Sequence, residues 1–171
     1  MQNHSEQDTD PTKTFSHIVQ QRDYPMVIVT AMGDGEHSGC LVGLNTQCSI
    51  HPPRMMVCIS KRNHTFEVAL KSTHLAVHFL AEDERELAYL FGHETGDRIN
   101  KFSRCSWTGG PGGVPVLTEC KRWIAGPIVD RVDAGDHMAF IISPDEAHCE
   151  PGEVAQLNYQ KVKSIEPGHL P

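Results

Sequence analysis

The sequence lacks several features that would assign it to a functional class at once. No apolar run approaches the ~20 residues that a membrane-spanning helix needs, so no membrane association is predicted. The first residues are polar and acidic and lack the basic start and apolar stretch of a signal peptide, which favours a cytoplasmic location. Lysine and arginine form no long stripe, and the formal net charge of −7 would repel a phosphate backbone, so nucleic-acid binding is not expected.

Metal and nucleotide signatures are also missing. The chain has no GxGxxG dinucleotide motif, no P-loop, no GxSxG turn and no HExxH zinc motif. Its six cysteines include no CxxC pair, and Cys40, Cys48 and Cys58 lie in apolar strand-like runs, so we interpret them as buried, reduced thiols. His74 and His78 share a strand-like segment, but no cysteine or carboxylate stands at ligand spacing, so no metal site is predicted.

The chain does have the length and apolar content of one folded domain. It contains 171 residues, of which 39% are apolar and 22% are charged, as is usual for a globular protein. No internal repeat and no linker marks a second domain. We expect a disordered tail over residues 1–12 and a single domain over residues 13–165.

The apolar pattern predicts many short strands with a few helices between them. Strands are expected at 26–32, 38–50, 55–60, 75–80, 116–117, 123–125, 128–132, 138–142 and 157–162. Helices are expected at 15–19, 65–70, 82–91 and 99–102, and the glycine-rich segment 107–113 is predicted to be a flexible loop. This order favours a β-barrel with α decorations over an alternating parallel sheet.

Three landmarks stand in one order along the chain. The first is the strand-like stretch 25–30, which leads into a glycine turn at 33–35. The second is Ser-Ile-His-Pro-Pro at 49–53, and the third is Gly-Asp-His at 135–137. Over residues 24–162 the chain therefore resembles the flavin reductase-like family, whose members are small FMN-binding barrels that pass electrons from NAD(P)H to a flavin.

The resemblance implies a fold and an activity. The fold is mainly β with α decorations, an FMN-binding split β-barrel of the antiparallel Greek-key type, and the protein is expected to be a homodimer. The activity is that of an NAD(P)H:flavin oxidoreductase, with FMN or, alternatively, FAD as flavin and NADH or NADPH as hydride donor. Reduced flavin then either leaves to supply a partner monooxygenase or stays bound.

The resemblance also indicates where the flavin ring lies. In the family, a strand ending in Thr-Ala and a glycine-containing strand before Ser-x-x-Pro-Pro lay their backbone along the ring, and Thr30, Ala31 and Gly39 stand in those places. Leu41 and Gly43 replace the Thr and Ser of many relatives, so the resemblance supplies no side-chain bonds to flavin there. The candidate ring-binding residues are Thr30, Asn45, Thr46, Gln47, Cys48 and Ser49.

A basic, hydroxyl-bearing loop precedes the helix expected at 65–70. A helix start with cationic side chains suits a phosphate, and relatives place the FMN phosphate in the corresponding loop. The candidate phosphate-binding residues are Ser60, Lys61, Arg62, Asn63 and Thr65. The alternative interpretation is that Asn63 or Thr65 only caps the helix, while Lys61 and Arg62 are solvated.

The Gly-Asp-His landmark supplies the one catalytic candidate, His137. The family's histidine at this place lies beside the nicotinamide or the flavin face, where an imidazole can donate a hydrogen bond. The alternative is a turn aspartate followed by a histidine satisfied within the sheet. Lys101, Phe102 and Trp107 match further family landmarks, and most residues of this kind are interpreted as core or dimer contacts. Trp107 and Trp123 stay open as cofactor neighbours, because an exposed aromatic ring can stack on flavin, adenine or nicotinamide.

Two other functions stay open at this point. One is a flavin-binding redox or sensor module without reductase turnover, which the departures at Leu41 and Gly43 leave open. The other is a member of the same fold that binds haem or a deazaflavin. An absorbance spectrum and an NADH oxidation assay separate these alternatives from a reductase.

Overall fold

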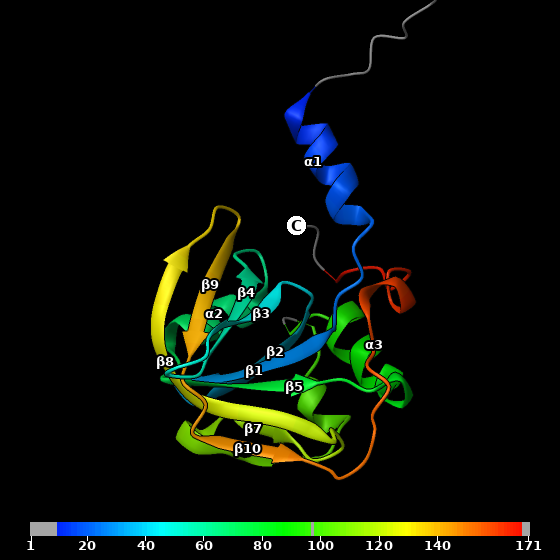
Figure 1. Cartoon of the computed structure of the whole chain (residues 1–171). Coiled ribbons are helices and arrows are strands. Elements are labelled where there is room, and N and C mark those ends of the chain that lie inside the picture. The colour runs from blue at the N-terminus through cyan, green and yellow to red at the C-terminus, as the bar shows by residue number, and fades with distance from the viewer. Residues whose placement is uncertain (1–9, 97, 169–171) are drawn as a thin grey trace, which may run out of the picture.

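The computed structural model describes residues 10–96 and 98–168 of the chain. Its antiparallel strands form one curled sheet, a half-barrel with few helices (Figure 1). The neighbours along this sheet are β2 (Glu36–Val42), β1 (Val27–Gly33), β5 (His74–Phe79), β8 (Arg122–Asp133), β9 (His137–Ile142), β4 (Arg54–Ser60) and β3 (Asn45–Ser49). β10 (Glu146–Cys149) also pairs with β8, and a small second sheet joins β6 (Trp107–Gly109) to β7 (Pro115–Leu117). The predicted split-barrel fold is confirmed.

One long strand joins the two halves of the curled sheet. Residues 123–127 of β8 pair with β5, whereas residues 128–133 pair with β9. At Gly126, just before the change of partner, a side chain would collide with the carbonyl oxygen of Ser143. The expectation of two separate strands over 123–132 is therefore wrong, because a single strand runs through both pairings.

Two apolar clusters lie on opposite faces of β1. The inner one includes Val29 and is covered by α2 (His64–Lys71). The outer one includes Ile28 and packs against α3 (Arg85–His93), which contributes Phe91. Because both faces of β1 are buried, its sequence reads as a continuous apolar run rather than as an alternating one.

His78 of β5 lies fully buried in this core. Its Nε2 accepts a hydrogen bond from the Leu117 N–H at 2.9 Å, so Nδ1 carries the proton and donates to the Ile28 carbonyl at 3.1 Å. Burial lowers the pKa of His78 from 6.5 to about 4. His78 is therefore a neutral side chain that ties β7 to β1 and β5.

The first helix, α1 (Pro11–Gln20), begins earlier than predicted. Asp10 is its N-cap and accepts from the Thr12 N–H at 2.9 Å, and proline at the first helical position favours this start. The helix points away from the half-barrel (Figure 1), and Phe15 and Ile18 are exposed. The tail expected over 1–12 is thus wrong for its last two residues, and residues 1–9 lie outside the described part of the chain.

The strand expected at 38–50 is two strands, β2 and β3. They separate at Gly43, where an added Cβ would lie 2.6 Å from the Tyr24 ring, so the chain passes this ring only because the residue is glycine. Leu44 then bonds across to β4, accepting from the Cys58 N–H at 2.8 Å. A tertiary contact therefore divides a stretch that is uniformly strand-like in sequence.

The glycine-rich segment 107–113 is ordered rather than a flexible loop. Its first residues form β6, and a tight turn follows in which Gly112 and Gly113 have positive φ values of 63° and 80°. The Gly110 N–H closes this turn on the Val114 carbonyl at 2.8 Å. The prediction was wrong because these glycines provide turn geometry that L-residues rarely adopt.

Other expectations near the C-terminus also change. The strand predicted at 157–162 is absent from the described residues; the segment forms a 3-10 turn, η4 (Tyr159–Lys161), and one isolated bridge from Asn158 to Pro25. The helix expected at 99–102 is a single 3-10 turn, η2 (Lys101–Ser103), and β10 was not predicted. The helices expected at 65–70 and 82–91 correspond to α2 and to a 3-10 turn, η1 (Glu82–Glu84), followed by α3.

The cysteines divide between core and surface. Cys40 is buried, which raises the pKa of its thiol to about 11, so it is a poor nucleophile. Cys48 was expected to be buried but is exposed, because β3 is an edge strand of the sheet.

Within the described ranges, no helix is long and apolar enough to cross a membrane.

Candidate functional site

The basic loop and the Gly-Asp-His turn, far apart in sequence, meet in the structure. Ser60, the last residue of β4, pairs directly with His137, the first residue of β9. The next residue continues the contact, since the Lys61 N–H donates to the Asp136 carbonyl at 2.9 Å. The predicted phosphate loop and the Gly-Asp-His landmark therefore form one continuous surface.

At the start of α2, two of the predicted phosphate ligands have structural roles. Asn63 is the N-cap, and its Oδ1 accepts from the Thr65 N–H at 3.0 Å. The Thr65 side chain is buried, with its hydroxyl 2.9 Å from that of Ser38. Asn63 therefore caps the helix, as the alternative interpretation expected, while the buried Thr65 side chain is engaged with Ser38.

Lys61 and Arg62 lie at the rim of this surface. The Lys61 Nζ lies 2.7 Å from Asp133 Oδ1 at the tip of the β8–β9 hairpin, and this hydrogen bond is the main cause of the lowered pKa of Asp133. Arg62 is exposed, and its backbone N–H donates to Ser60 Oγ at 3.3 Å. Two cations thus flank the end of β4, and the ion pair with Asp133 fixes Lys61.

A cavity of about 220 Å³, here called the phosphate-loop cavity, lies beside this loop. Its walls come from the loop, β2, the end of α3 and the C-terminal segment, and they comprise Ser60, Asn63, Leu41, Phe91, Gly92, Glu94, Thr95, Pro167 and Gly168. Thr95 is 6% exposed, and its hydroxyl has no hydrogen-bond partner among the described residues. A buried hydroxyl without a partner is costly, so it marks a place where a polar ligand group is favoured.

The C-terminal segment closes one side of the phosphate-loop cavity. The Gly168 N–H donates to the Gly92 carbonyl at 3.2 Å, and His93 Nδ1 donates to the Glu166 carbonyl at 3.0 Å. A Cβ on Gly168 would collide with the His93 carbonyl and lie 2.6 Å from Thr95. Only glycine allows the chain to approach α3 this closely.

The ring-binding candidates of β3 do not line the phosphate-loop cavity. Asn45, Thr46 and Gln47 line a separate groove of about 580 Å³ together with residues 22–25. The Asn45 side chain donates to the carbonyls of Pro25 and Gly43, at 3.0 and 3.1 Å. Cys48 and Ser49 follow on the same edge strand, with a register shift between Gln47 and Ser49.

Thr30 is not part of any surface. It is 0% exposed in the middle of β1, between Gly39 and Ala76 of the two neighbouring strands. Its hydroxyl donates to the Pro115 carbonyl. The expectation that Thr30 binds the cofactor is therefore wrong, because its side chain and its backbone are both committed within the protein.

His137 is partly exposed, with 22% of its side chain accessible. Its Nδ1 lies 2.7 Å from Asp136 Oδ1, and this hydrogen bond is the main cause of the lowered pKa of Asp136. Asp136 fixes the orientation of the ring through Nδ1 and does not bond to Nε2. An imidazole held in this way can position a neighbouring ligand.

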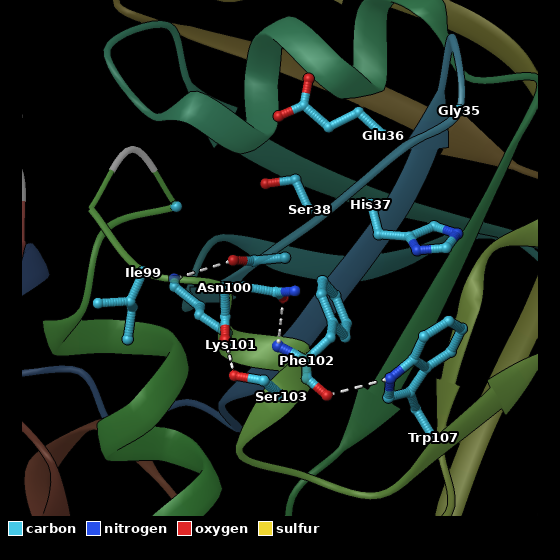
Figure 2. Close-up of a pocket in the computed structure, with 12 residues that line it drawn as sticks. Gly35, Glu36, His37, Ser38, Ile99, Asn100, Lys101, Phe102, Ser103 and Trp107 are labelled. Carbon is cyan, nitrogen blue, oxygen red and sulfur yellow. Dashed lines mark hydrogen bonds between the residues drawn. The ribbon is translucent and has the colours of Figure 1, made fainter.

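A third cavity, of about 440 Å³ and here called the aromatic cavity, was not predicted from the sequence (Figure 2). It is lined by residues 35–39, Gly96, residues 99–103 and Trp107. Trp107, a predicted cofactor neighbour, lines this cavity, whereas Lys101 and Phe102 were interpreted as core or dimer contacts and no role was predicted for His37. No local pattern joins β2 to η2, so only the folded chain shows that they share a cavity.

Among residues 10–96 and 98–168, no three histidine, cysteine or acidic side chains gather as a metal site would require.

The sequence itself matches the profile of the flavin reductase like domain over residues 21–166. The chain belongs to this family.

Individual relatives are distant. A stachydrine N-demethylase reductase subunit of Rhizobium meliloti is 26% identical over 66% of this chain and 50% of its own length. This chain thus spans about half the length of that relative. The NADH:riboflavin 5′-phosphate oxidoreductase of Streptomyces pristinaespiralis is 26% identical over 87% of this chain and 85% of its own. The crystal structure of a Streptomyces globisporus NADH:FAD oxidoreductase has a TM-score of 0.78 at 19% identity, covering 89% and 90% of the two chains, and so shares the fold.

Proposed function

We propose that the protein is an NAD(P)H-dependent flavin reductase that transfers hydride from NADH or NADPH to FMN. One observation carries the proposal. Within the family match over residues 21–166, the register of β4 and β9 sets the basic loop at Ser60 directly beside His137. The names of relatives, such as the NADH:riboflavin 5′-phosphate oxidoreductase, support the same reaction.

The residues around the phosphate-loop cavity fit a flavin phosphate. Ser60 offers a hydroxyl, Lys61 and Arg62 offer positive charge, and the start of α2 adds the positive end of a helix dipole. The unpartnered Thr95 hydroxyl is a further donor. Asn63 helps indirectly by capping α2, which keeps the loop in place.

The flavin ring would extend from this phosphate site toward β3. As an edge strand, β3 has backbone N–H and C=O groups that are not used by a neighbouring strand, and these can meet the polar edge of the ring. Residues 45–49 therefore stay as predicted ring contacts through their backbone. A bound flavin supplies the hydride-accepting ring.

His137 is proposed to position the hydride donor. Asp136 holds its Nδ1, so its ring keeps one orientation beside Ser60. Hydride transfer depends on the placement of donor and acceptor, so a hydrogen bond from this imidazole contributes through orientation. We assign His137 no proton-transfer step.

The wider assembly is also part of the proposal. The exposed apolar residues Phe15 and Ile18 of α1, and Val129 and Val132 of β8, suit a homodimer interface. Names such as that of the monooxygenase reductase component of Rhodococcus opacus support the supply of reduced flavin to a partner monooxygenase. We further propose a cytoplasmic location, a single domain over residues 13–165, and FAD as the alternative flavin.

The decisive experiment combines spectroscopy with turnover. The purified protein is titrated with FMN, and oxidation of NADH and NADPH is followed with and without flavin. Flavin-dependent oxidation is expected. Flavin binding without oxidation would instead establish the sensor module, and a haem spectrum would overturn both functions.

A further inference from the structure

The aromatic cavity has a wall built from three rings. His37 and Trp107 have centroids 4.8 Å apart at 68°, and Phe102 and Trp107 have centroids 5.7 Å apart at 67°. The Trp107 indole is held in place because its Nε1–H donates to the Phe102 carbonyl at 3.2 Å (Figure 2). Phe102 is buried and supports the exposed His37 ring and the partly exposed Trp107 ring, which suit stacking with a planar base.

The rest of the cavity suits a nucleoside. Its volume of about 440 Å³ falls within the usual range for small-molecule sites, roughly 300–1,000 Å³. Ser38 and Asn100 bring polar groups to the lining, with Asn100 beside Phe102 (Figure 2). The Asn100 side chain is fixed, because its Oδ1 accepts from the Phe102 N–H at 3.0 Å. An adenine base could then stack on the aromatic rings, and its ribose could form hydrogen bonds with the polar residues of the lining.

The charge at the cavity decides which nucleoside fits. Lys101 is 5% exposed, and its Nζ donates to the Gly39 and Phe91 carbonyls at 3.0 and 3.2 Å, so its charge is held within the wall. Glu36, in contrast, keeps 56% of its side chain accessible. A carboxylate accepts hydrogen bonds from ribose hydroxyls and repels a 2′-phosphate.

The aromatic cavity also adjoins the proposed flavin site. Glu36 Oε1 pairs with His64 Nε2 at 2.7 Å, and a Cβ on Gly96 would lie 2.8 Å from the His64 ring. His64 is the first residue of α2, directly after Asn63, which lines the phosphate-loop cavity. A nucleotide in the aromatic cavity would therefore have its phosphates near the start of α2, where the helix dipole favours negative charge.

We propose that the aromatic cavity binds an adenosine 5′-phosphate group with a free ribose 2′-hydroxyl, and that Glu36 selects against a 2′-phosphate. Two ligands of the proposed reaction carry this group, NADH and FAD, whereas NADPH does not. The inference rests on the proposed reductase function. It adds a preference for NADH over NADPH that the family match does not supply.

The first test compares hydride donors in the variant Glu36→Gln. Removing one repelling charge is expected to raise kcat/KM for NADPH relative to NADH by about tenfold. Asp34→Asn is the matched control, because Asp34 lies in the same turn and pairs with Lys71 at 3.4 Å but does not line the cavity. The role of Glu36 would be overturned if Glu36→Gln changed neither the NADPH:NADH ratio of kcat/KM nor the FAD:FMN ratio of affinities. An equal change in Asp34→Asn would overturn it as well.

The second test needs no activity. In a Trp123→Phe background, Trp107 is the remaining tryptophan of the two in the chain, so its fluorescence reports ligand in the aromatic cavity. Quenching by 5′-AMP is expected at lower concentration than quenching by adenosine 2′,5′-bisphosphate, and Glu36→Gln should narrow the difference. Equal affinity of the two probes, or no quenching, would refute the adenosine site.

The two proposals fail in different ways. If 5′-AMP quenches Trp107 but neither NADH nor NADPH is oxidised, the reductase proposal is wrong and the adenosine site stands. If Glu36→Gln alters the affinity for FAD relative to FMN but leaves the NADH:NADPH ratio unchanged, the site is supported with FAD as its ligand. If reductase activity is present and the probes do not differ, only the adenosine site is refuted.

Discussion

His78 and His137 show how differently one side chain is used in the interior of the sheet and at its rim. His78 is fully buried, and both of its ring nitrogens bond to the backbone. His137 is partly exposed at the start of β9, and its Nδ1 pairs with an exposed carboxylate. The interior histidine is fixed by three strands, whereas Asp136 engages only Nδ1 of the rim histidine. Their different hydrogen-bond partners, rather than the residue type, separate a structural role from a functional one.

The largest expected effect is on stability, from His78→Leu. The substitution leaves the Leu117 N–H and the Ile28 carbonyl buried without a partner, which should cost about 2–5 kcal/mol of the free energy of unfolding. Chemical denaturation measures this loss. His17→Ala, at an exposed position of α1, is the control and should change little. A similar loss in both variants would mean that the hydrogen bonds of His78 are not what stabilises the core.

His78 should also make stability depend on pH. Its pKa is about 4 in the folded protein against 6.5 as the reference value, so the unfolded chain binds the extra proton first as pH falls. The contribution is fully present above pH 6.5 and is lost as pH falls toward 4, a change of roughly 3 kcal/mol. Denaturation curves of His78→Leu should lack this part of the pH dependence.

At the rim, the double variant Lys61→Ala, Arg62→Ala tests the phosphate site. Charge-assisted contacts of this kind contribute about 1.5–3 kcal/mol, so FMN binding should weaken roughly tenfold to several hundredfold, while riboflavin binding changes little. Fluorescence titration with the two flavins measures the difference. Asp133→Asn removes the partner of Lys61 but keeps the cation, and should weaken FMN binding much less. An equal loss for FMN and riboflavin would place the phosphate elsewhere.

The sequence predicted the helix and strands around the proposed phosphate site better than it predicted how they are arranged. β4, α2 and β9 are compact apolar or well-capped segments with clear ends, so local patterns were enough to locate them. The pairing of Ser60 with His137 is a matter of strand register, which no local pattern contains. The aromatic cavity was missed for the same reason, since His37 and Trp107 meet only through the fold. Thr30 was misassigned because a strand residue looks alike in sequence whether one or both of its faces are buried.

His137→Ala tests the rim histidine itself. Loss of one positioning hydrogen bond should lower kcat/KM for NAD(P)H by ~10–100-fold, while the Kd for FMN and the melting temperature stay nearly constant. Steady-state kinetics and a melting curve from one preparation measure both. A fall in melting temperature with unchanged kinetics would make His137 a second structural histidine and remove the contrast with His78.

The smallest effect is expected from Gly168→Val, which tests whether the C-terminal segment limits access to the phosphate-loop cavity. The cavity of about 220 Å³ is proposed to hold the phosphate end of FMN, so a wall that opens more easily should release this end faster. A valine side chain would collide with the His93 carbonyl and Thr95, and so break the Gly168–Gly92 hydrogen bond. Losing one such bond, about 0.5–1.5 kcal/mol, should speed FMN dissociation by about 2- to 10-fold in stopped-flow measurements. Gly109→Ala is the matched control, because no atom lies within 4 Å of its added Cβ. Unchanged exchange rates in Gly168→Val would show that the C-terminal segment does not limit the exchange of FMN.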